Sequence, residues 1–469
     1  MFRNDNPGPS ATDGMIGIVG GGIAGLAAAY RLQQHDYDVR VFEAGEEVGG
    51  LAASYETRGD PIEQFYHHLS ASEQTIVELA DELGLGDAVE WRVGKNAYYV
   101  DGVSHPLDTP WEILAYPHLS LYEKYRLAML TTGIDVRGRI PQRGAYEDRS
   151  AYEDVPVEEF LLEHTTRGVY EYFFEPLLEA KFGDRTADVS AAWLLGRIAF
   201  RGERDLLRGE YLGYVDGGFA RLLDALIDAI GPDSIETGAL VTAVGIDDGG
   251  VDSMTVDSDD ESVTYDVEAV VVATMPTVLE SLVGYPCEID FQGTICTTFG
   301  LEESVLDTYW LNIADDAPFG VLIEHTNFVP VERYGGEHLL YAASYVQDLD
   351  DPFWKLSDAE VEARWIQGIA DLFPSFDPTT IEWIETARNP RTAPVYECGY
   401  LDMVVPYDLA NEVADGVYYA GMASRAQYPE RSLDGGVVAG FTCADLIADG
   451  APSDGRGSGH LEPTDDSPS

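Results

Sequence analysis

Residues 15–29 read MIGIVGGGIAGLAAA, and this stretch decides the fold. A short apolar run, expected to be a strand, leads into Gly20-x-Gly22-x-x-Gly25 and then into an Ala- and Leu-rich run expected to be a helix. Gly20 permits a tight turn, Gly22 lets the backbone approach a pyrophosphate, and Gly25 lets the helix pack on the strand. The amino end of that helix presents N–H groups and a positive dipole to phosphate oxygens. The stretch therefore predicts the dinucleotide-binding turn of a Rossmann-type βαβ unit.

A second strand is expected over residues 38–42, and the acidic residue Glu43 follows it directly. A carboxylate there can accept hydrogen bonds from the ribose hydroxyls of an adenosine, and its charge disfavours a 2′-phosphate. An ordinary surface acid is the alternative interpretation, because the chain contains 84 Asp and Glu residues.

Residues 17–54, GIVGGGIAGLAAAYRLQQHDYDVRVFEAGEEVGGLAAS, resemble the flavin amine oxidase, protoporphyrinogen oxidase and phytoene desaturase superfamily, and most closely its protoporphyrinogen-oxidase-like members. The family mark is a second glycine pair after the ribose acid, here Gly49-Gly50, whose backbone approaches the dinucleotide from the far side. A protein that binds only nicotinamide has no need of this pair, so FAD is the cofactor implied. In this region the resemblance implies cofactor contacts from Gly20, Gly22, Ile23, Ala24, Gly25, Glu43, Ala44, Gly49, Gly50 and Leu51.

Three further matches lie far downstream, so the resemblance covers roughly residues 14–450. The strand expected from residue 239 places Val241 where the family makes a backbone contact to adenine, and Ala273 begins an Ala-Thr-x-Pro turn. Near the end of the chain, an Ala-Gly pair after a strand precedes a helix whose amino end faces the flavin, where its dipole can stabilise the reduced ring. This last match adds the implied contacts Gly421, Met422, Gly435, Gly436 and Val437.

Three positions depart from the family pattern. Leu51 stands where many members carry Arg, and Met422 replaces the acid after the Ala-Gly pair. Ser432 occupies the place where amine oxidases have an aromatic residue that forms half of a cage around the amine. The last departure counts against a simple amine substrate and leaves dehydrogenation of a carbon–carbon bond or a larger ring system open.

The fold class that follows is α/β, with a Rossmann-like FAD-binding domain of the glutathione-reductase-like (GR2) type and an inserted α+β substrate domain. The FAD-binding domain is expected over residues 14–60, 214–284 and 396–450, and the substrate domain over 61–213 and 285–395. Residues 1–13 and 451–469, rich in Pro, Ser, Gly and Asp, are expected to be disordered tails.

The charge of the chain is extreme: 84 acidic residues against 28 basic ones give a formal net charge of -56. Because the acids are spread along the whole chain, we expect adaptation to a salty cytosol, where salt screens their repulsion. Binding of a basic partner is the alternative. Nucleic acids and anionic membranes would be repelled.

The remaining composition indicates a cytoplasmic protein. The four cysteines have neither CxxC nor metal-ligand spacing, so no metal site is expected. No apolar run reaches the length of an integral membrane segment.

The candidate catalytic residues are His67, His68 and Lys181. The histidines lie in a run, residues 62–68, that resembles one in protoporphyrinogen-oxidase-like proteins, and imidazole titrates near neutrality. The alternative is that one histidine packs between domains and the other is solvated. Lys181 stands out because lysine is nearly absent, although an ion pair with Glu179 or Asp184 would explain it.

Three other stretches are candidates for the substrate site. Trp310 and His325 would line it, but core packing is the preferred interpretation of both. Residues 428–431 precede the flavin-facing helix and would approach the ring. The apolar stretch 111–130 is expected to be an ordinary core helix.

Three functions compete. The leading hypothesis is transfer of a hydride from a small organic substrate to FAD, with reoxidation by O2 or another acceptor. The second is a non-redox flavin isomerase of the UDP-galactopyranose mutase type, which needs arginines for a diphosphate. Arginines compatible with it are Arg137, Arg139, Arg143, Arg197, Arg201 and Arg204. The third is a non-catalytic binding protein of the GDP-dissociation-inhibitor type, which the intact glycines and Glu43 argue against.

Overall fold

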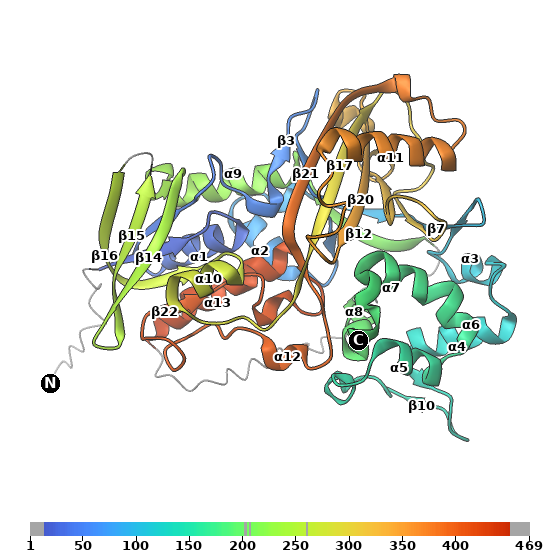
Figure 1. Ribbon diagram of the computed structural model, residues 1–469, viewed down its shortest axis with the longest axis horizontal. Helices are drawn as coiled ribbons and strands as arrows, with labels where there is room; N and C mark the ends of the chain where they lie inside the picture. The colour runs from blue at the N-terminus through green and yellow to red at the C-terminus, as the bar shows by residue number, and fades with distance from the viewer. Residues whose placement is uncertain (1–13, 201–203, 206–207, 259–260, 451–469) are drawn as a thin grey trace, which may run out of the picture.

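The computed structural model describes residues 14–200, 204–205, 208–258 and 261–450. The two expected tails lie outside these ranges. The polypeptide forms three regions: a Rossmann-like sheet with its helices, a second sheet covered by one long helix, and a helical lobe below that second sheet (Figure 1).

The first sheet has a parallel core in the order β13-β2-β1-β16-β22. Its strands are β13 (Ile235–Glu236), β2 (Asp38–Phe42), β1 (Met15–Val19), β16 (Glu261–Val272) and β22 (Val417–Tyr419). Strand β16 is long, and its first half continues into an antiparallel meander with β15 (Gly250–Ser258) and β14 (Ala239–Asp247).

Layers on both sides bury the parallel core, as its nearly continuous apolar strands require. Ile16 and Ile18 of β1 face a helical layer, whereas Val19 faces the side chains of the meander. The helical layer consists of α1 (Ile23–Gln34), α9 (Gly218–Ile230) and α13 (Leu433–Asp449), and α2 (Gln74–Glu82) packs on α13. Helix α10 (Pro276–Val283) contacts β14.

The second sheet has the order β21-β17-β20-β19-β18-β7-β8. Its strands are β21 (Ile381–Pro394), β17 (Phe291–Leu301), β20 (His338–Val346), β19 (Val321–Glu324), β18 (Trp310–Ile313), β7 (Asn96–Val100) and β8 (Val103–Pro106). Helix α11 (Asp358–Leu372) covers one face through Val361, Trp365 and Ile369. The other face joins the same core as the helical layer of the first sheet.

Short elements connect these regions. Two small sheets contain β3 (Ser54–Tyr55) with β4 (Ile62–Glu63), and β5 (Leu69–Ser70), β6 (Val89–Gly94) and β11 (Arg204–Asp205) with β12 (Gly209–Val215). The helical lobe contains α3 (Pro110–Ala115), α4 (Leu121–Thr131), the β9–β10 hairpin (Ile134–Asp135 and Gln142–Arg143), α5 (Val157–His164), α6 (Arg167–Val169), α7 (Glu175–Phe182) and α8 (Ala191–Phe200). Helix α12 (Tyr400–Met403) follows β21.

The stretch 111–130 differs from its expectation as a core helix. It forms two short helices, α3 and α4, because the capping residues Thr109 and Ser120 each begin a helix of their own. Much of its apolar surface faces outward: Trp111 is 68% exposed and Leu121 is 76% exposed. The prediction was wrong because composition alone does not tell which apolar side chains find a partner.

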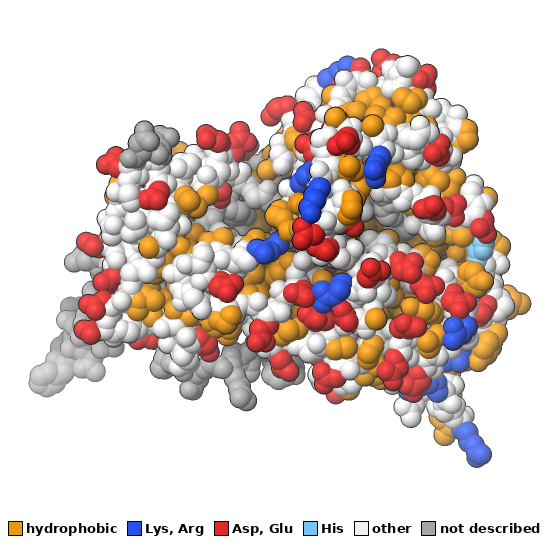
Figure 2. Space-filling view, in the orientation of Figure 1, with side chains coloured by type: hydrophobic (Ala, Val, Ile, Leu, Met, Phe, Trp, Pro, Cys, Tyr) orange, Lys and Arg blue, Asp and Glu red, His pale blue; other side chains and the backbone are white. Residues whose placement is uncertain are grey.

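Acidic side chains are scattered over the whole visible face of the molecule, and basic ones are few (Figure 2). Within the described residues, no helix combines the length and apolar character needed to cross a bilayer.

Candidate cofactor and substrate site

The carboxyl ends of three parallel strands meet at one edge of the first sheet. The backbone N–H of Gly20 donates to Phe42 O at 2.9 Å, and that of Ala273 donates to Val19 O at 2.9 Å. The N–H of Ala420 donates to Val272 O at 3.0 Å, which brings the following Gly421 to the same edge. Ligands of open α/β sheets bind at this edge.

The glycines of the first turn have the geometry expected of a phosphate-binding turn. Gly20 has a φ of 105°, which is strained for other residues. A Cβ atom on Gly25 would lie 2.0 Å from Gly20 O, so α1 packs against the turn only with glycine there. A Cβ on Gly22 would meet nothing within 4 Å, and no side chain caps the amino end of α1. The structure therefore leaves space and backbone donors for a pyrophosphate at this end of α1.

Glu43 holds the turn in place. Its Oε2 accepts from Gly21 N at 2.7 Å, and its Oε1 accepts from Gly45 N at 2.8 Å. Each carboxylate oxygen can accept a further bond, so the ribose contact stays a prediction beside this structural role. Ala44 is exposed next to it.

The second glycine pair lies against the first turn. Gly49 N donates to Gly21 O at 2.9 Å, and Gly22 and Gly49 form an isolated parallel bridge. Both glycines of the pair have positive φ, and a Cβ on Gly50 would lie 3.4 Å from Gly22 Cα. Leu51 follows in a 3-10 turn.

Val241 lies close to the end of β2. Ala239 N, at the start of β14, donates to Glu43 O at 2.8 Å. Val241 is two residues further along the strand, where the register with β15 is irregular. The adenine contact of Val241 that the resemblance implies stays a prediction.

Helix α13 begins beside the first turn of α1. Ser432 caps it by accepting from Gly435 N at 3.0 Å. A Cβ on Gly436 would lie 2.7 Å from Ile23 Cγ2, and one on Gly440 would lie 2.3 Å from Ala24 O. The small residues thus bring Gly435, Gly436 and Val437 next to Ile23 and Ala24. Met422 is partly buried after the β22 edge.

Three side chains from separate elements form what is here called the tyrosine–arginine cluster: Tyr66 after β4, Tyr345 on β20 and Arg431. Arg431 directly precedes Ser432, the cap of α13. The side chains of Tyr66 and Arg431 are both close enough to Tyr345 to influence the ionisation of its hydroxyl. All three side chains keep some exposed surface, although desolvation is the largest influence on their pKa values.

The two candidate histidines lie next to this cluster. His67 Nδ1 lies 2.5 Å from Phe65 O, so Nδ1 carries the proton and donates. Burial, and then the charge of Arg431, lower the pKa of His67 to about 4, which keeps the ring neutral. His68 Nδ1 lies 3.0 Å from Tyr309 Oη, and its ring contacts Trp310.

Lys181 pairs with Glu430 and not with the expected Glu179 or Asp184. Lys181 Nζ lies 2.8 Å from Glu430 Oε1, and Arg197 pairs with the other oxygen of the same carboxylate. The rings of Phe182, Trp193 and Tyr396 surround the ammonium group at 5.2 to 5.6 Å. The prediction of a local pair was wrong because α7 directs the side chain across to the segment before α13, which is 249 residues away.

Trp310 and His325, the two candidates for the substrate site, differ in their surroundings. Trp310 is partly exposed and makes an edge contact with Tyr66 at 5.1 Å, so it lies beside the cluster. His325 is fully packed, and its Nε2 lies 2.7 Å from Tyr334 Oη. The core interpretation therefore fits His325.

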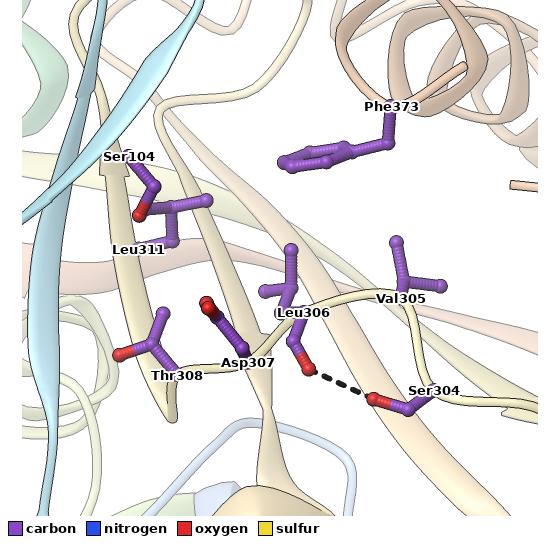
Figure 3. A pocket seen from close by; sticks show the side chains of 8 residues that line it. All are labelled: Ser104, Ser304, Val305, Leu306, Asp307, Thr308, Leu311 and Phe373. Carbon is purple, nitrogen blue, oxygen red and sulfur yellow. Dashed lines mark hydrogen bonds between the residues drawn. The ribbon is translucent and has the colours of Figure 1, made fainter. Parts of the chain in front are cut away.

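A separate hollow of about 370 Å³ lies at the opposite face of the second sheet (Figure 3). Leu311 and Phe373, two of its lining residues, pack with the core under α11, whereas Trp310 points to the other face. This hollow is therefore not part of the cofactor site.

Sequence reasoning missed two residues of the site. Tyr345 lies in an ordinary-looking strand, and nothing in its local pattern marks it. Asp434 lies in the first turn of α13, and its carboxylate accepts from Ile76 N at 2.7 Å, which fixes α2 to α13.

A family model for flavin-containing amine oxidoreductases matches residues 23–448. The chain belongs to this family. The match begins within the glycine turn, after Gly20 and Gly22, and covers the second sheet and the first turns of α13, so the chain is a member of a family of FAD-dependent oxidoreductases. The residues present fit FAD: a dinucleotide turn, an uncapped helix end and a second glycine pair form one continuous cradle.

Named relatives agree with this assignment. The chain is 29% identical to protoporphyrinogen oxidase 2 of Arabidopsis thaliana over 166 aligned residues. The alignment covers 35% of this chain and 31% of that protein. It is 30% identical to coproporphyrinogen III oxidase of Propionibacterium freudenreichii subsp. freudenreichii over 190 aligned residues. That alignment covers 38% of this chain and 34% of the relative. The matches span about a third of these relatives.

Solved structures share the fold over nearly the whole chain. A putative protoporphyrinogen oxidase from Exiguobacterium sp. 255-15 is 19% identical with a TM-score of 0.72, covering 94% of this chain and 100% of that one. A reduced UDP-galactopyranose mutase is 17% identical with a TM-score of 0.69, covering 94% and 96%. These likenesses establish the GR2-type α/β fold.

Proposed function

We propose that the protein dehydrogenates a small organic substrate held between the FAD cradle and the second sheet. The observation that carries the proposal is the partly buried tyrosine–arginine cluster, whose Arg431 directly precedes the cap of α13. Bound FAD supplies an acceptor for a hydride. The chain's own groups then bind the substrate, orient it and exclude water.

The proposal assigns regions and residues as the sequence predicted them. Residues 14–60, 214–284 and 396–450 form the FAD-binding domain, and 61–213 with 285–395 form the substrate domain. The cofactor contacts are those named above from the glycine turn to Val437. We place the reaction in a salty cytosol, with O2 or another acceptor reoxidising the flavin.

A porphyrinogen-like tetrapyrrole is the substrate class to test first. Both named relatives are porphyrinogen oxidases, and Ser432 removes the aromatic residue that amine oxidases place beside the flavin. Trp310 and Tyr66 offer aromatic surface for a large ring.

The isomerase alternative has weaker support. It needs arginines that converge on a diphosphate, but Arg137 pairs with Asp135 on the exposed β9–β10 hairpin, and Arg139 and Arg143 are exposed there too. Arg197 is engaged by Glu430. Arg201 and the side chain of Arg204 lie outside the described residues.

The test is anaerobic reduction of the FAD-loaded protein in concentrated salt. Coproporphyrinogen III and protoporphyrinogen IX are each mixed with it, with benzylamine and UDP-galactopyranose as comparison compounds. The proposal predicts bleaching of the oxidised flavin band by a porphyrinogen and recovery of the band with O2. Sugar isomerisation with no net flavin reduction would contradict it and favour the isomerase.

A further inference from the structure

We propose that Tyr345 accepts the proton that leaves the substrate during dehydrogenation, and that Arg431 is the positioning residue that stabilises its phenolate. The inference rests on the proposed function, because it assigns the proton that accompanies hydride transfer. His67, His68 and Lys181 were the sequence candidates for this role.

The pleat of β20 directs Tyr345 toward the cofactor domain. Leu340, Ala342 and Val346 pack under α11, whereas Leu339, Tyr341 and Ala343 belong to the core shared with the first sheet. The period of two in a strand places Tyr345 on the second of these faces. On that face Tyr341 Oη donates to Glu63 O at 2.6 Å, close to the segment that carries Tyr66.

Arg431 is an unusual cation in this protein. It immediately precedes the cap of α13, and the groups that favour its positive charge are the hydroxyls of Tyr345, Tyr66 and Tyr396. Within the described part of the chain, no Asp or Glu forms an ion pair with it, although the sequence has three times as many acids as bases. The neighbouring Lys181 and Arg197 share the single carboxylate of Glu430, one on each oxygen.

A deeply placed guanidinium without a carboxylate is costly unless another negative group compensates it. The titratable groups that face Tyr345 are Tyr66 from the β4–β5 segment, Arg431 from before α13, Lys181 from α7 and Tyr396 from the segment after β21. None of them is an acid, and Tyr345 is the group that most favours the charge of Arg431. A phenolate on Tyr345 would supply the missing negative charge.

The titration order of these groups agrees with the assignment. Burial is the largest single influence and would raise the pKa of Tyr345, but the charges of Arg431 and then Lys181, together with the polar side chains of Tyr66 and Arg431, lower the pKa to about 8. Burial raises the pKa of Tyr66, and burial with Arg431 lowers that of His67 to about 4. Proton transfer is most effective when the acceptor's pKa is near the working pH, which favours Tyr345 over both neighbours.

The step balances as a dehydrogenation. A substrate C–H bond breaks, and its hydrogen leaves with both electrons as hydride to FAD. An N–H or O–H bond conjugated with that carbon loses its proton to the Tyr345 phenolate oxygen, and the electron pair left behind forms the new double bond. The substrate is oxidised by two electrons, FAD is reduced by two, and Tyr345 returns the proton to solvent.

The experiment compares the FAD-loaded wild type with Tyr345→Phe, Tyr66→Phe and the exposed control Tyr172→Phe. Flavin reduction by coproporphyrinogen III is followed anaerobically against pH, and tyrosinate formation is followed by ultraviolet difference spectra without substrate. We expect the wild-type rate to rise with pH with an apparent pKa of about 8. Tyr345→Phe should lose that rise, reduce about 100-fold more slowly, and lose one tyrosinate transition near the same pH.

Two results would overturn the inference. One is a Tyr345→Phe variant that binds FAD and reduces it with an unchanged pH profile. The other is the same tyrosinate transition in wild type and Tyr345→Phe. If no porphyrinogen reduces the wild type, the proposed substrate class fails instead, and the tyrosinate titration still decides the ionisation of Tyr345.

Arg431→Gln separates stabilisation of Tyr345 from direct binding of an anionic substrate. The inference predicts that the tyrosinate transition moves to higher pH in this variant, together with the pH profile of flavin reduction. A raised KM with both transitions unmoved would contradict the positioning role and assign Arg431 to a substrate anion.

Discussion

At the residue scale, Gly22 and Gly25 respond in opposite ways to an added methyl group. Gly22→Ala places its Cβ in open space, so the free energy of unfolding without FAD should stay within about 0.5 kcal/mol of wild type. The same methyl group occupies the approach to the pyrophosphate, so FAD binding should weaken at least tenfold, or about 1.4 kcal/mol. Fluorescence titration with FAD measures the second effect.

Gly25→Ala is the matched variant. Its Cβ would lie 2.0 Å from a backbone oxygen that cannot move freely, so unfolding should become easier by about 2 kcal/mol even without FAD. If Gly22→Ala bound FAD as tightly as wild type, the assignment of this turn to the pyrophosphate would be wrong.

The buried carboxyl group of Glu63 should make the free energy of unfolding depend on pH. It is fully buried and accepts from Phe219 N and Tyr214 Oη, both at 2.8 Å. Burial raises its pKa from 4.5 to about 7, so the folded state holds the proton more tightly than the unfolded chain. The free energy of unfolding should therefore fall by about 3 kcal/mol through this group as pH rises from about 4.5 to about 7.

Glu63→Gln removes this ionisation, and urea unfolding across that pH range measures the difference. The variant should lose the decline, while the exposed control Glu46→Gln should keep it. Equal pH dependence in Glu63→Gln and wild type would show that Glu63 does not titrate in this range.

Residues of the cofactor cradle could be predicted from sequence, but those of the substrate site could not. The glycine turn and Glu43 are local in sequence, and each has a backbone reason for its residue type. Tyr345 and Glu430 acquire their roles from partners on other elements, such as Lys181 at 249 residues from Glu430. A single sequence contains no signal for such distant pairs.

At the element scale, the crossing of α1 and α13 positions both helix ends toward the cofactor. Gly440→Ala would push a Cβ to 2.3 Å from Ala24 O and 2.9 Å from Ala28 N, which are backbone atoms of α1. We expect a loss of about 2 kcal/mol in unfolding free energy and weaker FAD binding, because the helices must separate.

Thr442→Ala is the control on the same helix, since its hydroxyl donates only to Val438 O of α13. Thermal unfolding and FAD retention of the two variants check this prediction. A Gly440→Ala protein as stable as Thr442→Ala would contradict the tight crossing.

Elements with strong local signals were predictable. The strand expected over residues 38–42 corresponds to β2, and the strand expected from residue 239 corresponds to β14. In the stretch 111–130 the two helix starts were readable from the capping boxes at Thr109 and Ser120, but the exposed face was not, because it depends on the absence of a packing partner among the described residues. Hydrophobic composition favoured the core there, and tertiary context overrode it.

At the scale of the whole molecule, the first sheet collects strands from three distant parts of the chain. The sequence predicted this assembly through the family resemblance, because the motifs occur in the same order. It did not predict how the second sheet faces the cofactor edge, which requires the pairing of β7 with β18 across more than two hundred residues.

The net charge of -56 predicts that the stability of the protein depends on the salt concentration. Screening length falls from about 10 Å at 0.1 M to about 3 Å at 1 M salt, so repulsion among the scattered acids fades in concentrated salt. We expect the unfolding temperature and FAD retention to rise with KCl over this range. Equal values at both concentrations would contradict salt adaptation and favour a basic partner as the reason for the charge.

The most direct test of the central claim is the visible spectrum of the protein purified in concentrated salt. We predict a flavin spectrum that stays with the protein through gel filtration, and one FAD released per chain on denaturation. A folded, colourless protein that takes up no added FAD would contradict the account, because the cradle from Gly20 to Val437 would then serve another ligand.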